Sequence, residues 1–332
     1  MKRFAHRLGF FLLFGAFSLP EAVSTMTFGN FESICEKTSF PICAVVNAAH
    51  HSSGFSRGIV PVCYARLVEL ANTMIFQIGN AFIHFGAIIV GLIIIFNVRA
   101  KYTAIGRTEM LTFFYLYIAL VISSLVVDCG VSPPSSASYA YFVALQLGFA
   151  SSVCIALLFN GIVCFQFWED GSKKSLWSMR AVCAIWFAIN FIVAIVSLKS
   201  WDLLLEDTKT LALFAVSYVM NAVILAVYVV SQLILVFVAL DLLWYLGAIV
   251  LFSFFFIVSQ ILVYVFSQQI CEGTTHYVDG LFFGSLCNLF AVMMVYKFWD
   301  MITAEDLEFS VANVEHGISA FGDTEKRGST FY

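Results

Sequence analysis

Polar side chains set within long apolar stretches are the residues of this chain that could do chemistry. In the first stretch six of them would share one face of a helix, within an arc of about 140°. They are Glu69, Asn72, Thr73, Gln77, Asn80 and His84. Amides and hydroxyls commonly join membrane helices through hydrogen bonds, so we interpret this face as a seam inside a bundle. A docking surface for another membrane protein is the alternative. A proton relay through Glu69 and His84 is disfavoured, because no matching ladder of carboxylates occurs on another stretch.

The last apolar stretch carries a second set, in which small residues recur four positions apart. Asp279 stands at its start, followed by Gly280, Gly284 and Asn288. This small-xxx-small spacing lets another helix approach closely. We therefore predict a close helix contact here, with packing inside the chain favoured over contact with a second protein.

Enzyme signatures are absent from the sequence. It has no glycine-rich phosphate loop, no His-Glu-x-x-His and no Gly-x-Ser-x-Gly. The cysteines lack the clustered spacing of a zinc site, and the last stretch has no lysine at mid-depth that could hold retinal. We predict no catalytic residues, no metal and no cofactor, and hence a protein that is not an enzyme.

Seven long apolar stretches must position these polar residues. Hydrophobic residues make up 61% of the chain and charged residues 11%, against roughly 25% charged in a soluble domain. A membrane helix needs about 20 mostly apolar residues. The stretches that satisfy this are 68–98, 110–127, 139–167, 179–198, 211–239, 242–268 and 276–299. The sequence predicts an all-α integral membrane protein, a bundle of seven transmembrane helices in the lipid bilayer. A net charge of −4 without a basic cluster argues against a nucleic-acid partner.

Basic residues gather at alternate joints between the stretches, which indicates the orientation. At the first and third joints they are Arg99, Lys101, Arg107, Lys173, Lys174 and Arg180. The joints at 128–138 and 269–275 carry no Lys or Arg. Because Lys and Arg favour the cytoplasmic side, we predict a luminal N-terminus and a cytoplasmic C-terminus.

Four segments are expected along the chain. Residues 1–25 have the form of a signal peptide, because basic residues precede an apolar run and Ala22-Val23-Ser24 offers small residues for cleavage. An uncleaved extension before Met26 is the alternative. Residues 26–67 form a luminal segment that contains cysteines, residues 68–299 the membrane domain, and residues 300–332 an acidic cytoplasmic tail.

Five of the nine cysteines fall on the predicted luminal side, where disulfides persist. They are Cys35, Cys43, Cys63, Cys129 and Cys271. Five thiols allow two bridges with one left over, and the sequence does not say which cysteines pair.

The tail contains two candidate export signals. Asp306 and Glu308 have the form of a di-acidic motif that vesicle-coat cargo-binding proteins recognise, and the chain ends in an aromatic pair, Phe331 and Tyr332. Asp-x-Glu also arises by chance in acidic tails, so a merely solvated tail is the alternative.

Several blocks in order resemble one family, the fungal chitin synthase export chaperones. They are FGNFESIC (28–35), CYARLVELANT (63–73), GNAFIH (79–84), FFYLY (113–117), EDG (169–171), SLW (175–177), HYVDGLFF (276–283), MMVYK (293–297) and EDLEFS (305–310). The resemblance covers about residues 28–311. It implies a multi-pass protein of the endoplasmic reticulum membrane that helps a chitin synthase fold and leave for the cell surface, and so supports chitin synthesis in the cell wall.

Two other classes share the seven stretches. A heptahelical receptor is disfavoured because no Asp-Arg-Tyr follows the third stretch and no Asn-Pro-x-x-Tyr occurs in the seventh. A small-solute transporter is disfavoured because none of the five prolines interrupts a stretch.

Overall fold

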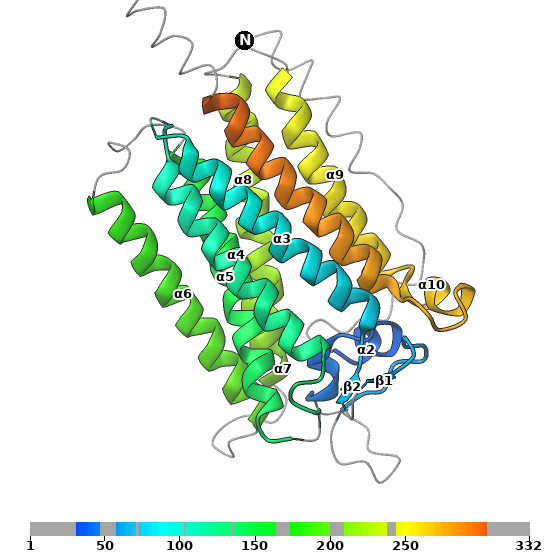
Figure 1. The fold of residues 1–332 in the computed structure, drawn as a ribbon. Coiled ribbons are helices and arrows are strands. Elements are labelled where there is room, and N and C mark those ends of the chain that lie inside the picture. The colour runs from blue at the N-terminus through cyan, green and yellow to red at the C-terminus, as the bar shows by residue number, and fades with distance from the viewer. Residues whose placement is uncertain are drawn as a thin grey trace, which may run out of the picture.

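A computed structural model describes residues 31–46, 58–70, 73–102, 104–134, 136–163, 173–199, 209–237 and 244–303. Within this part of the chain, seven helices are long and apolar enough to cross a membrane, and they lie alongside one another as a bundle (Figure 1). They are α3 (Ile78–Ala100), α4 (Arg107–Asp128), α5 (Tyr139–Val163), α6 (Lys173–Lys199), the helix Leu211–Leu235, α9 (Trp244–Tyr264) and the last helix, Gly280–Thr303. The predicted all-α bundle of seven membrane-spanning helices is thereby confirmed.

The order of packing in the bundle follows the chain over its first half. Helix α5 lies against α4 and α6, α3 packs on α4, and α5 also contacts α8 (Met220–Leu235). The fifth spanning helix is made of α7 (Lys209–Phe214), the π-helical turn η4 (Ala215–Val219) and α8. Because hydrocarbon offers no hydrogen bonds to the backbone, each of these segments satisfies its N–H and C=O groups within a helix.

The first spanning helix begins at Ile78, so the predicted span over 68–98 is wrong at its start. Before this helix, β1 (Val68–Leu70) and β2 (Thr73–Ile75) pair as an antiparallel hairpin, with Val68 opposite Ile75. Strand residues such as Val, Thr and Ile are stiff at χ1 and suit an extended backbone. The apolar composition of this segment therefore belongs to a hairpin and not to the spanning helix.

The sixth predicted span, 242–268, is also too long. Helix α9 ends at Tyr264, and a short separate helix follows, α10 (Ser267–Gly273). Thr275 and His276 then adopt positive φ angles of 52° and 68°, which turns the chain into the last helix. A left-handed backbone is costly for a β-branched residue, so the surrounding contacts must hold this turn.

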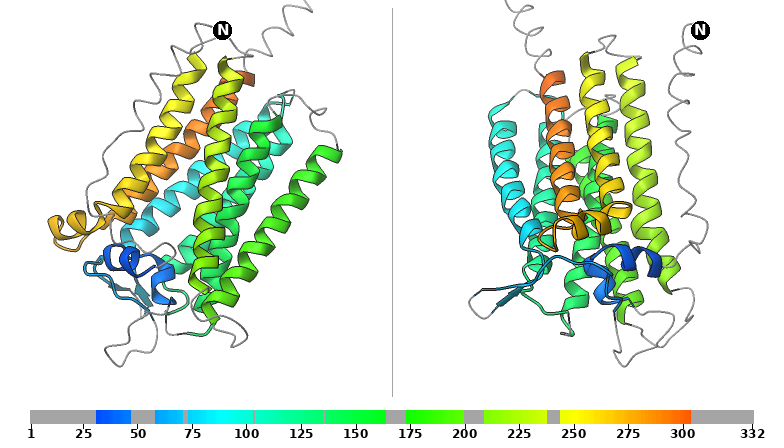
Figure 2. Two further views of the ribbon diagram at one scale, coloured as in Figure 1. Left: turned by 180° about the vertical axis from the view of Figure 1, so that it is seen from behind. Right: turned by 90° about the vertical axis from the view of Figure 1, so that its right-hand side faces the viewer.

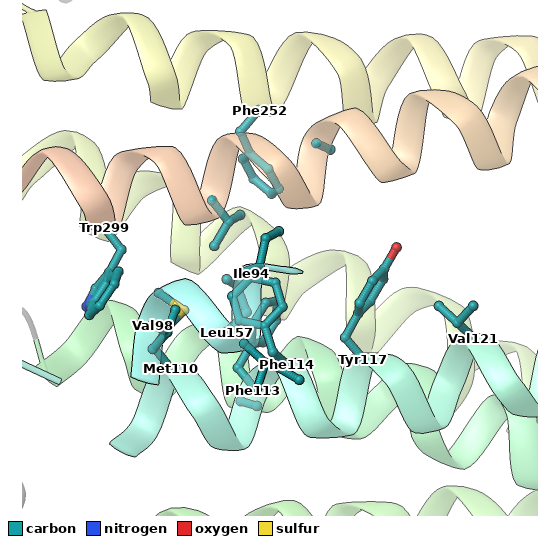
Figure 3. Close-up of a cluster of buried hydrophobic side chains, with 14 of the residues drawn as sticks. Ile94, Val98, Met110, Phe113, Phe114, Tyr117, Val121, Leu157, Phe252 and Trp299 are labelled. Atoms are coloured by element: carbon teal, nitrogen blue, oxygen red, sulfur yellow. The ribbon is translucent and has the colours of Figure 1, made fainter. Parts of the chain in front are cut away.

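Aromatic and branched side chains fill the middle of the bundle (Figure 3). Phe113 and Phe114 of α4 meet edge to face, with ring centroids 5.1 Å apart. Figure 3 shows Ile94 of α3 and Phe252 of α9 pointing into the same cluster. Since lipid tails are as apolar as these side chains, the helices are held together by close packing here.

The short helices and strands described outside the spans gather at one end of the bundle, which we name the disulfide end (Figure 2). They comprise α2 (Glu32–Lys37), the 3-10 helix η3 (Pro41–Ala44), the hairpin and α10. Phe31 and Ile42 from the N-terminal part are buried in one cluster with Val127, Tyr139 and Leu198 from the helix ends. The N-terminal segment therefore covers the ends of the spanning helices.

Candidate functional site

Asp128, the last residue of α4, is the centre of a buried polar network at the disulfide end. It is only 3% exposed. Asn80 Nδ2 donates to Asp128 Oδ2 over 2.7 Å, and His84 Nε2 lies 3.0 Å from the same oxygen. The backbone N–H groups of Phe76 and Gln77 donate to the Asp128 carbonyl oxygen over 3.2 and 3.4 Å. Asp128 thereby holds the first turns of α3 against the end of α4.

Asp279, which directly precedes the last helix, connects the N-terminal segment to the helix ends. Ser39 Oγ donates to Asp279 Oδ2 over 2.6 Å. The other carboxylate oxygen, Oδ1, accepts from the backbone N–H of Phe282 at 3.3 Å and so caps the last helix. Gln77 Nε2 donates to the Ser39 carbonyl oxygen over 2.9 Å. One chain of contacts therefore runs from the last helix through Ser39 to α3.

Electrostatics within this network disfavour charge on Asp279. Burial raises the pKa of the Asp279 carboxyl, the Ser39 and Phe282 hydrogen bonds oppose that increase, and the nearby charge of Asp128 adds to it. The network joins four parts of the chain through neutral and charge-assisted hydrogen bonds. Its physical role is to fix the N-terminal segment on the helix ends.

Two disulfides strengthen the same end. Cys35 is bonded to Cys43 across α2 and η3, and Cys63 to Cys271 of α10. The second bridge closes a sequence separation of 208 residues, so it ties the segment before the hairpin to the region between the sixth and seventh spanning helices. Cys129 is a free thiol.

The free thiol of Cys129 lies next to the hub of the network. Burial raises its pKa, and the neighbouring Asp128 carboxylate raises it further. Because the thiolate is the nucleophile in disulfide exchange, a raised pKa makes Cys129 less reactive.

His276 lies beside the second disulfide. Its Nδ1 is 3.3 Å from Cys63 Sγ and 3.8 Å from Cys271 Sγ, and 3.2 Å from the carbonyl oxygen of Tyr64. The two sulfurs and the ring nitrogen lie close enough to one another to hold a metal ion. Both sulfurs are joined to each other, so neither is a thiolate that could bind a metal.

The six residues predicted to share one helical face do not do so, because the helix starts too late. Glu69 and Thr73 lie in the hairpin, and Asn72 is outside the described residues. Gln77 directly precedes α3, so only Asn80 and His84 stand on the helix itself. These last two do share a direction, since both reach the Asp128 carboxylate.

The small residues of the last helix pack inside the chain. A Cβ atom added at Gly280 would lie 2.6 Å from the carbonyl oxygen of Leu262, and one added at Gly284 would lie 2.3 Å from Val263 Cγ2. Ser259 Oγ of α9 also donates to the Gly284 carbonyl oxygen over 2.9 Å. These contacts bring the last helix against α9.

Asn288 stands one turn further along the last helix, and its side chain is exposed at the surface of the bundle. It is therefore separate from the packed face that Gly280 and Gly284 form.

Charged residues at the opposite end join α3 to the end of the last helix. Asp300 accepts hydrogen bonds from Lys101 and from Lys297 Nζ, the latter over 3.1 Å. Trp299 Nε1 donates to the Ile105 carbonyl oxygen over 3.0 Å. The candidate export residues Asp306, Glu308, Phe331 and Tyr332 lie outside the described residues.

Sequence reasoning missed two members of the network, Asp128 and Ser39. A signal for Asp128 was present, since a carboxylate at the end of an apolar stretch is costly unless it has a partner. Asn80 and His84 are suitable partners on the neighbouring stretch. Ser39 had no such signal, because its role depends on the fold of the N-terminal segment over the helix ends.

Comparison with known proteins agrees with this architecture. A family model described as chitin synthase export chaperone matches residues 27–313. The chain belongs to this family. A chitin synthase export chaperone of Debaryomyces hansenii is 68% identical over 308 residues, which cover 92% of this chain and 100% of that protein. Those of Candida albicans and Saccharomyces cerevisiae are 66% and 48% identical, over 92% and 88% of this chain and 100% and 97% of theirs. No solved structure matches the chain.

The family membership confirms the resemblance found in the sequence, and the family name supports the export chaperone over a receptor or a transporter. The name also implies a role other than catalysis.

Proposed function

We propose that this chain is a chaperone of the endoplasmic reticulum membrane that a chitin synthase requires for folding and for export to the cell surface. The observation that carries the proposal is the 68% identity to a chitin synthase export chaperone over the whole length of that relative. The seven spanning helices supply the membrane location that a chaperone of a membrane-embedded client needs. The chain acts without catalysis and without a cofactor.

Deletion of the gene tests this function. A chitin synthase carrying a fluorescent tag should remain in the endoplasmic reticulum, and cell-wall chitin should fall, while an unrelated secreted protein leaves at its normal rate. Re-expression of the full chain should restore delivery. If every chitin synthase of the deletion strain reaches the surface normally, the proposed function is wrong.

We also propose that the disulfide end is luminal and the tail after Trp299 is cytoplasmic. The two disulfides suit an oxidising compartment, and Lys101 and Lys297 stand at the opposite end. Protease added to intact microsomes should then remove an epitope placed after Tyr332 and spare one placed near Asn47. If the protease removes only the epitope near Asn47, the orientation is the opposite of the one proposed.

Within the membrane domain we propose different roles for the polar residues singled out in the sequence. Asn80 and His84 serve the seam of the bundle, which their contacts with Asp128 support. Asn288 meets the client, because an exposed amide among lipid tails lacks a hydrogen-bond partner. Asn288→Leu should therefore lower co-purification of the synthase at unchanged protein level, whereas Asn80→Leu should lower the protein level.

The tail is proposed to carry an export signal at Asp306 and Glu308 that coat proteins recognise through charge-assisted contacts. The double change of both residues to Ala should slow the entry of this chain into vesicles in a reconstituted budding reaction. If budding is unchanged, Phe331 and Tyr332 are tested by deletion of 312–332. Unchanged budding after both changes would mean that the tail carries no such signal.

A further inference from the structure

A cavity of about 570 Å³ lies at the disulfide end, between the N-terminal segment and the ends of α3 and α4. This is the size of pockets that hold small molecules or the side chains of a peptide. Most of its wall is apolar, with Phe40, Ile59, Phe76, Val127 and Tyr139 among the lining residues.

The wall of this cavity is held in place by covalent and hydrogen bonds. The disulfide between Cys35 and Cys43 fixes one side. The backbone N–H of Ile59 donates to the Cys43 carbonyl oxygen over 2.8 Å, and that of Val62 donates to the carbonyl oxygen of Glu36 over 2.9 Å. The cavity is therefore part of the folded N-terminal segment.

Two buried polar side chains line the cavity and retain free acceptor capacity. Gln77 is 8% exposed; its Nε2 donates to the Ser39 carbonyl oxygen, and its Oε1 atom has no hydrogen-bond partner among the described residues. Both contacts to the Asp128 carboxylate go to Oδ2, and no described residue donates to Oδ1. A carboxylate can accept about four hydrogen bonds, so this group has room for another donor.

No described residue of the cavity wall carries a positive charge that would pair with the Asp128 carboxylate. Asp128 is the one charged residue among those that line it in the described part of the chain, and no Lys, Arg or His is among them. His84 reaches Asp128 from α3 without lining the cavity. A ligand that fits this cavity would be apolar and would carry a cation or several N–H donors to bind the carboxylate.

The rim of the cavity favours a protein as the source of that group. Val60, Tyr64 and Leu67 line the cavity and are 77%, 47% and 44% exposed, and they stand outside the spanning helices. Exposed apolar side chains gathered beside a pocket mark a contact surface for another protein.

We propose that this cavity binds an apolar peptide segment of the client that carries one Lys or Arg, with the cation directed to Asp128 and the apolar side chains against the rim. The proposal rests on the proposed function, since it takes the client to be the source of the peptide. It adds a contact with the client at the disulfide end, outside the hydrocarbon region, to the contact proposed at Asn288.

Photo-cross-linking in microsomes tests the proposal on the full-length chain co-expressed with a tagged chitin synthase. A photoreactive amino acid replaces Leu67 at the rim. Val60 lines the cavity, so Val60→Lys adds an ammonium group at its rim, where it competes with the client's cation for Asp128. Val60→Leu keeps the wall apolar, and Val62→Lys adds the same charge at a position that is 67% exposed and does not line the cavity. None of these positions is buried, so folding should persist in all three variants.

We expect an adduct with the synthase that maps by mass spectrometry to a segment containing Lys or Arg. Its yield should fall about tenfold or more in Val60→Lys, the size expected for loss of one charge-assisted hydrogen bond, and should stay within about twofold in both controls. Equal yields in Val60→Lys and Val62→Lys would overturn the proposal. An adduct with lipid, or with residues 47–57 of this same chain, would overturn it too.

Failure of this proposal can be told from failure of the proposed function. If Val60→Lys supports normal export of the synthase while the deletion strain retains it, the cavity has no role in recognition and the chaperone function stands. If the deletion strain exports the synthase normally, the proposed function itself is wrong.

Discussion

A double-mutant cycle at the contact between α9 and the last helix tests the packing on which the bundle depends. A Cβ atom at Gly284 would lie 2.3 Å from Val263 Cγ2, whereas ordinary contacts of this kind begin near 3.4 Å. The next neighbours, Oγ and the carbonyl oxygen of Ser259, would be 3.5 and 3.6 Å away and need not move. The clash of Gly284→Ala is therefore with a single methyl group.

The size of the effect follows from these distances. Val263 is 7% exposed and β-branched, so it cannot turn aside without leaving its preferred rotamer. Overpacking of this kind costs about 1–3 kcal/mol, and the gain of Ala over Gly in a helix offsets about 1 kcal/mol at most. Val263→Ala removes the clashing methyl, so the two changes together should cost about 1–2 kcal/mol less than the sum of the single changes.

Unfolding of the purified chain in mixed detergent micelles measures these free energies, with helix content recorded as the denaturing detergent increases. Gly86→Ala is the matched control, because Gly86 is also in a spanning helix and nothing lies within 4 Å of an added Cβ atom. Its free energy of unfolding should be unchanged or higher. Strictly additive effects at Gly284 and Val263 would refute the contact.

Three further outcomes follow from the network and the disulfides. Cys63→Ser should lower the melting temperature of the chain by several degrees, because it removes the disulfide that joins residues 208 positions apart. Cys129→Ser should leave the melting temperature and the mobility on a non-reducing gel unchanged, because Cys129 is a free thiol. Because burial raises the pKa of Asp279 above its ordinary value of 3.8, the folded chain holds that proton longer. Stability should therefore fall as the pH rises from 3.8 to the folded-state pKa, and Asp279→Asn should remove this fall in a pH series of melting temperatures. Asp128→Leu should lower the melting temperature more than Asp128→Asn, because it leaves the Asn80 amide without its acceptor.

The seven spanning helices could be predicted from the sequence because length and hydropathy along the chain are sufficient for that purpose. A backbone in hydrocarbon must bond to itself, so an apolar stretch of about 20 residues has essentially one structure open to it. The errors fall where this constraint ends. Strands β1 and β2 lie outside the spans, where a hairpin can form as well as a helix, and local composition did not distinguish the two.

The partners of the polar residues depend on the tertiary structure. Asn80 and His84 were singled out by their type and spacing, but Asp128 as their common acceptor follows from the packing of α3 against α4. Ser39 reaches Asp279 because the N-terminal segment folds over the helix ends, and nothing in the nearby sequence indicates that path.

The number of cysteines outside the apolar stretches and the seven stretches themselves were determined by the sequence alone, since both are properties of residues in order along the chain. The pairing of Cys63 with Cys271 was decided by the tertiary structure, which brings together residues that six spanning helices separate. The same holds for the cavity beside Asp128, whose wall comes from segments on either side of the first two spans. Residues distant in sequence meet only through packing, and packing depends on three-dimensional shape that no local pattern contains.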